Sequence, residues 1–104
     1  MAPHKSSSIE ASIYEAFIED IIGKTFKILP IWEDCAAEKE NFESFDSYLD
    51  KLITMLIGSN YIQKEEKIYS VLVMLKGLQA REDLTQRKVK SIVFHCIDLL
   101  KKVN

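Results

Sequence analysis

The fold class follows from one stretch of this chain, residues 45–56, which reads FDSYLDKLITML. Its apolar side chains recur at positions i, i+3, i+4, i+7, i+8 and i+11, which is the spacing of one face of an α-helix. Gly58 follows, at a position where helices commonly end. The stretch therefore predicts an amphipathic helix over about residues 42–57. Its apolar stripe comprises Phe45, Tyr48, Leu49, Leu52, Ile53 and Leu56.

Three further segments have the same helical periodicity. Ser7 and Glu10 have the form of a capping box, and the apolar positions that follow them predict a first helix. Thr85 is placed to cap a last helix, and another helix follows the turn at Gly58. The predicted helices cover residues 8–29, 42–57, 63–80 and 85–103.

Pro30 is expected to end or kink the first helix, because the residue before a proline is disfavoured in the α-helical conformation. Residues 31–41 are then the longest connection in the chain, with at most one short helical turn. This connection contains Cys35 and the only tryptophan, Trp32. Trp32 is either a lid that closes the end of the fold or an exposed anchor for a binding partner.

The predicted architecture is all-α, a compact four-helix bundle, because no segment alternates apolar and polar residues with the period of a β-strand. Residues 8–104 are expected to form this single domain, and residues 1–7 a flexible N-terminal tail. A chain of 104 residues is large enough for one ordinary core. Its 3 Gly, 2 Pro and 2 Cys exclude the collagen-like, low-complexity and disulfide-scaffold classes.

The net charge of −2 conceals an asymmetry between the two halves of the chain. Residues 1–52 contain five basic and eleven acidic side chains, a net charge of −6. Residues 53–104 contain nine basic and five acidic side chains, a net charge of +4. Unlike charges of this kind can attract helices within one chain or orient two chains that associate, while apolar side chains supply most of the affinity.

The predicted helices also contain more apolar residues than one buried stripe requires, and the surplus on the first helix comprises Ile18, Ile22 and Phe26. The surplus on the last two helices is either core, if both lie centrally in the bundle, or an exposed patch that marks an interface. The candidate partner contacts are the anchors Trp32, Tyr69, Val73, Phe94 and Ile97, with Arg87, Lys88 and Lys90 as a polar rim.

The sequence lacks the motifs of catalysis and metal binding. It has no glycine-rich phosphate loop and no Gly-x-Ser-x-Gly nucleophile elbow. His95 and Cys96 are adjacent on a predicted helix, so their side chains diverge by about 100° and do not form a metal-ligand pair. We interpret His95 as a partly buried helix residue and Cys96 as a core residue. We expect no catalytic residue, no metal and no cofactor, and hence no enzyme.

The N-terminal residues MAPHKSSS lack the apolar region of a secretory signal. The longest unbroken apolar run, residues 71–75, is far shorter than the roughly 18 residues of a membrane-spanning helix. We expect a cytoplasmic protein that has reduced cysteines and no membrane partner.

These observations favour a small helical module that acts by binding a protein partner or a second copy of itself, as an accessory, regulator or immunity-type inhibitor. The alternative is a regulatory protein that binds nucleic acid through the basic face of the predicted helix at 85–103. Nucleic acid is the less favoured partner, because the acidic residues Glu65, Glu66, Glu82 and Asp83 interrupt the basic surface and the isoelectric point is about 5.7.

Overall fold

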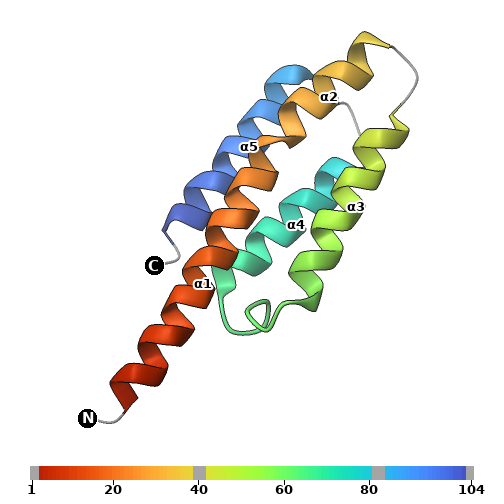
Figure 1. Ribbon diagram of the computed structural model, residues 1–104. Helices are drawn as coiled ribbons and strands as arrows, with labels where there is room; N and C mark the ends of the chain where they lie inside the picture. The colour runs from red at the N-terminus through yellow and green to blue at the C-terminus, as the bar shows by residue number, and fades with distance from the viewer. Residues whose placement is uncertain (1–2, 39–41, 81–83, 103–104) are drawn as a thin grey trace.

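The computed structural model describes residues 3–38, 42–80 and 84–102, with side chains from residue 11 onward. Within these ranges the chain forms helices and no strand. Figure 1 shows that the first two helices run end to end as one bent rod, which forms an antiparallel four-helix bundle with the other three. The predicted all-α four-helix bundle is therefore confirmed. The helices are α1 (Pro3–Phe26), α2 (Ile28–Ala37), α3 (Glu43–Gly58), α4 (Glu66–Ala80) and α5 (Gln86–Lys101).

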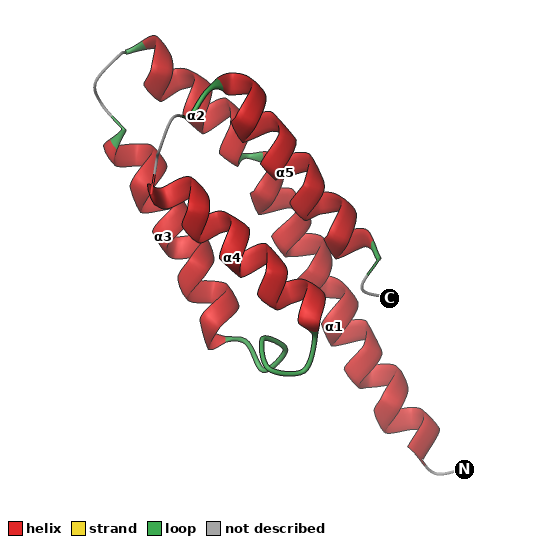
Figure 2. Cartoon of the chain, turned by 180° about the vertical axis from the view of Figure 1, so that it is seen from behind, coloured by secondary structure: helices red, strands yellow, loops and turns green. Residues whose placement is uncertain are grey.

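Helix α5 packs against three helices, α1, α2 and α4. Helix α3 packs against α2 on one side and α4 on the other. The side-chain oxygen of Thr85 accepts a hydrogen bond from the backbone N–H of Lys88 at 3.2 Å, which confirms the predicted N-cap of the last helix. Seen from behind in Figure 2, the loop between α3 and α4 closes the end of the bundle from which α1 projects.

Helix α1 begins at Pro3, so the predicted start of the first helix at residue 8 was wrong. Proline is well suited to the first position of a helix, because its fixed φ is helical and its missing N–H would have no partner there. The predicted flexibility of residues 1–7 stays a prediction.

The helix break that Pro30 was expected to cause lies at a different position. The helix is interrupted at Lys27, three residues before the proline, and then resumes as α2 through Ala37. The pyrrolidine ring of a proline clashes with the carbonyl four residues earlier, here that of Phe26, the last residue of α1. Pro30 itself lies in the first turn of α2, where a missing N–H leaves no helical bond unmade. The expected long connection is therefore mostly helix.

The core contains the stripe that predicted the fold, except for Tyr48. Its hydroxyl donates a 2.6 Å hydrogen bond to the carbonyl of Lys24, which ties α3 to α1 just before the bend. Thr25 is fully buried and donates to the carbonyl of Ile21 at 2.7 Å. The buried apolar residues are Ile18, Ile21, Ile28, Trp32, Cys35, Phe45, Leu49, Leu52, Ile53, Leu56, Ile68, Val71, Leu72, Leu75, Leu78, Val89, Val93, Cys96, Ile97 and Leu100.

Adjacent residues on α3 provide a test of this core. Leu56 is fully buried, whereas Ile57 is 52% exposed. Leu56→Ala should lower the free energy of unfolding by about 3 kcal/mol, because it removes buried surface and leaves a cavity. Ile57→Ala should change it by less than about 0.5 kcal/mol. Urea unfolding followed by far-UV circular dichroism measures both values, and similar losses for the two variants would contradict the assigned inner face of α3.

Cys96 provides a second test, because burial raises the pKa of its thiol from 9.0 to about 12. The unfolded chain releases this proton near pH 9 and the folded chain does not, so stability is complete below pH 9 and falls as the pH rises toward 12. We expect a loss of about 1 kcal/mol per pH unit in this window.

Unfolding under reducing conditions between pH 8.5 and 10.5 would measure this slope for the wild type and for Cys96→Ala. The variant should have the shallower slope, although not a flat one. Burial also raises the pKa of Tyr14, where Glu65 adds to the effect, and of Tyr48, where Asp20 does. Equal slopes would show that the Cys96 thiol ionises alike in the folded and unfolded chains.

Candidate functional site

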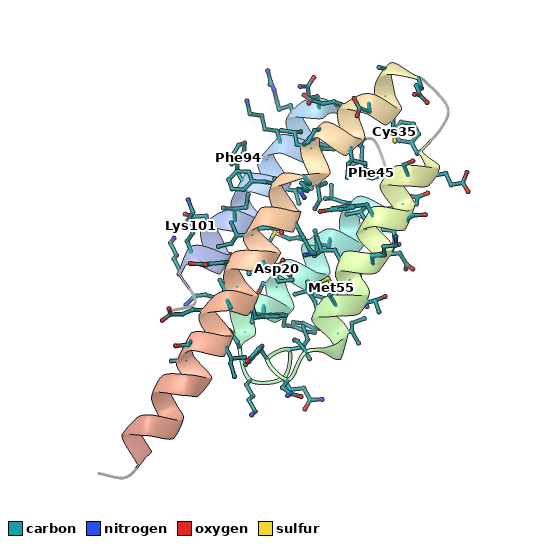
Figure 3. All side chains as sticks on the ribbon, in the orientation of Figure 1. Asp20, Cys35, Phe45, Met55, Phe94 and Lys101 are labelled. Carbon is teal, nitrogen blue, oxygen red and sulfur yellow. The ribbon has the colours of Figure 1, made fainter. Side chains whose placement is uncertain are left out.

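A shallow hollow of about 560 Å³ lies on the outer surface between α1 and α5. Figure 3 shows Phe94 and Lys101 projecting from α5 on the side away from α3. Because α1 and α5 are antiparallel neighbours, residues near the end of α1 meet the middle of α5. The hollow is lined by Phe26, Ser91, Phe94, His95, Ile97, Asp98 and Lys101.

An aromatic pair joins the two helices at this hollow. The rings of Phe26 and Phe94 have their centroids 6.1 Å apart and an interplanar angle of 80°, an edge-to-face arrangement. Phe26 is nevertheless 44% exposed and Phe94 45% exposed. The pair therefore contributes to the packing of α1 on α5 and still presents a large apolar area to solvent.

Helical spacing extends this pair into one continuous surface. Residues three, four or seven apart on a helix share a side, and the rows that contain Phe26 and Phe94 are largely exposed. We call this surface the α1–α5 face. It comprises Glu15, Glu19, Ile22 and Phe26 of α1 with Arg87, Lys90, Phe94 and Lys101 of α5.

The charges on this face are unevenly distributed. On α5, Asp98 forms an ion pair with Lys102 at 3.1 Å, so its charge is largely balanced by a residue of the same helix. On α1, Asp20 forms a 2.6 Å ion pair with Lys24 in the same way. The end of the face near the start of α5 is basic, whereas the α1 side of the other end is acidic.

The structure brings only part of the predicted site together. Phe94, Arg87 and Lys90 are exposed and lie together on the α1–α5 face. Lys88 is exposed, but it lies six residues from Phe94, on another side of α5. Its backbone N–H donates to the N-cap Thr85.

Tyr69 and Val73 belong to a different surface. Both are exposed, at 56% and 52%. The neighbouring Lys67 donates a hydrogen bond from Nζ to the carbonyl of Lys102 at the end of α5, so Lys67 lies on the α5 side of α4. Tyr69 is two residues further along, about 200° around the helix, and therefore lies on the opposite side. Tyr69 instead lines a separate hollow of about 550 Å³ beside the loop between α3 and α4.

Trp32 and Ile97 are corrections to the predicted site. Trp32 is 9% exposed and lies in the core, because the helix resumes after Lys27 and turns this side chain to the inner side of α2. Ile97 is 3% exposed and forms the buried floor of the hollow, one turn from Val93. Neither residue presents enough surface for the exposed anchor that was predicted.

Phe26 belongs to the α1–α5 face but was absent from the predicted site. Its apolar character had been assigned to the general surplus of the first helix. The spacing of Ile22 and Phe26, four residues apart and outside the inner stripe of α1, is the signal that marks it. What the sequence does not show is that α1 ends at Phe26 beside Phe94.

Polar side chains also line the hollow. His95 is exposed, so the prediction of a partly buried histidine was wrong. Ser91, His95 and Asp98 all belong to the hollow, but no hydrogen bond joins them among the residues that the structure describes. Nucleophilic catalysis relies on a base held in hydrogen-bond reach of its nucleophile and oriented by a third group. The arrangement here provides neither contact.

Cys96 confirms its prediction as a core residue, and Cys35, expected in a connection, is buried in α2. Both cysteines are free. Among the described residues, no three His, Cys, Asp or Glu side chains are grouped so that they could hold a metal ion.

None of the helices, over the residues that the structure describes, is both long and apolar enough to cross a membrane. No protein-family model matches the chain, and comparison with curated proteins and with solved structures finds no significant match.

Proposed function

We propose that this chain is a small, non-catalytic protein-binding module that contacts its partner through the α1–α5 face. One observation carries the proposal: the half-exposed pair Phe26 and Phe94 lies between charged residues on two packed helices. Aromatic side chains and arginine are enriched among the residues that dominate binding energy in protein interfaces. Covering the two rings would remove their remaining apolar surface from water at little entropic cost, because they already pack against each other.

The charges around the pair define the chemistry of the partner. Arg87 and Lys90 lie on the side of the face near the start of α5 and favour an acidic surface opposite them. Glu15 and Glu19 favour a basic surface at the other end. The fitting partner is therefore a protein surface with an apolar centre, acidic groups opposite the start of α5 and basic groups opposite the α1 side of the other end.

Nucleic acid remains the less favoured partner. A phosphate backbone requires a continuous basic track. The basic start of α5 lies against α2, where the carboxylate of Glu33 accepts a 2.6 Å hydrogen bond from the side chain of Gln86. Two exposed aromatic rings held edge to face suit a protein contact better than phosphate binding. We place the proposed interaction in the cytoplasm, where Cys35 and Cys96 would stay reduced.

Two exposed aromatic residues allow a matched test of this proposal. Phe94→Ala should reduce capture of the protein partner at least tenfold when the tagged chain is purified from its native host, because it removes half of the aromatic pair. Tyr69→Ala, which removes a ring on α4 that is 56% exposed against 45% for Phe94, should leave capture unchanged. Quantitative mass spectrometry of the captured proteins measures both effects.

The opposite pattern, with loss in Tyr69→Ala and none in Phe94→Ala, would place the contact on α4 and contradict the proposed face. Capture that consists of nuclease-sensitive RNA or DNA, and declines steeply with salt, would favour the nucleic-acid alternative.

A further inference from the structure

The N-terminal part of α1 projects from the bundle. The first ring contact along this helix is Tyr14, whose centroid lies 4.4 Å from that of Tyr61 in the loop between α3 and α4. Residues 3–13, which we call the α1 extension, precede this contact and extend beyond the bundle in Figures 1 and 2. Ile13, the last residue of the extension, is 59% exposed.

A projecting helix of this composition gains little stability from its own residues. It contains Ser6, Ser7 and Ser8, which favour helix interiors less than alanine or leucine. Most helical stability in proteins comes from packing an apolar side against a neighbour. The α1 extension has no such neighbour in its own bundle in Figure 1.

The chain exposes more surface than a compact monomer of its mass. The structure exposes 6931 Å². A compact monomer of 12.0 kDa exposes about 6000 Å² by the usual scaling with mass. The excess reflects the elongated shape of the chain, which extends over 58 × 20 × 19 Å, because the α1 extension projects from the bundle.

The charges of the α1–α5 face are placed so that they can pair with those of the same face on a second copy. Glu19 lies seven residues before Phe26 on α1, and Arg87 lies seven residues before Phe94 on α5. The two helices are antiparallel and meet at Phe26 and Phe94, so Glu19 and Arg87 lie about 10 Å to opposite sides of the aromatic pair. A two-fold rotation about that pair exchanges the two ends of the face, so the α1 side of one end, which contains Glu19, meets the start of α5, which contains Arg87; Lys101 lies on the α5 side of the end that contains Glu19.

We propose that the partner on the α1–α5 face is a second copy of this chain, an inference that rests on the proposed binding face. The two-fold axis passes near Phe26 and Phe94, so that Glu19 of each copy faces Arg87 of the other. In this register Ile13 lies about 20 Å from the aromatic pair and Gln86, the first residue of α5, about 12 Å from it, so the α1 extension of each copy projects past the start of α5 of the other. This arrangement is closed and uses the same surface on both chains, as a two-fold dimer requires.

Light scattering after size exclusion of the purified full chain, at tens of micromolar, tests the dimer. We expect a mass twice the 12.0 kDa of one chain. Glu19→Arg and Arg87→Glu should each weaken dimerisation at least tenfold, because each places two like-charge pairs in the symmetric interface. The double variant with both changes should recover most of the wild-type affinity. Asp50→Arg, which reverses an exposed acid on α3, is the matched control and should remain dimeric.

A monomeric wild-type chain would overturn this inference. If Phe94-dependent capture of a different protein persisted in that case, the proposed function would stand with another partner. A dimer that is unaffected by Glu19→Arg, Arg87→Glu and Phe94→Ala would overturn both the register and the proposed face. Failure of the double charge reversal to restore a dimer, with helical content retained by circular dichroism, would overturn the predicted pairing of Glu19 with Arg87.

Discussion

The structure depends on a steric constraint between Pro30 and the carbonyl of Phe26. The proline ring cannot lie against that carbonyl in a continuous helix, so α1 ends at Phe26 and the chain bends at Lys27. Because Pro30 then falls in the first turn of α2, the helix resumes at once. The bend keeps α2 in contact with α3 and α5 and turns Trp32 into the core. It also leaves Phe26 at the outer surface, in contact with Phe94.

The parts of the fold that could be predicted from sequence are those where the apolar pattern of a single segment is enough to assign a helix and its buried side. In residues 45–56 the stripe has a single period, and five of its six apolar positions are buried in α3. The rod formed by α1 and α2 could not be predicted in this way. A proline stops a helix or bends it according to whether its ring falls in a first turn, and that depends on how the two parts pack against α3 and α5.

The candidate site was predictable to a similar extent. Spacing along α5 places Phe94 with Arg87 and Lys90, because these residues share a side of one helix. Spacing does not determine which neighbour covers that side, and so Ile97 was predicted as a contact although the bundle buries it. The same limit applies to His95, whose exposure depends on the rotation of α5 about its own axis relative to the helices packed against it. Pairing between helices, such as Phe26 with Phe94, requires the three-dimensional arrangement.

The charge asymmetry of the chain is not neutralised by the ion pairs of its surface helices. Asp20 with Lys24, and Asp98 with Lys102, each join two residues of one helix, so they leave the difference between the acidic and basic halves unchanged. A compact bundle could have used that difference to hold α1 against α5, yet the contact between these helices includes an aromatic pair and buried apolar side chains. The unlike charges instead lie along an exposed face, on opposite sides of this pair. Charges in that position contribute little to the stability of a single chain, because water screens them. They contribute more to the orientation of two chains, because association excludes water from between them and a misaligned approach sets like charges together.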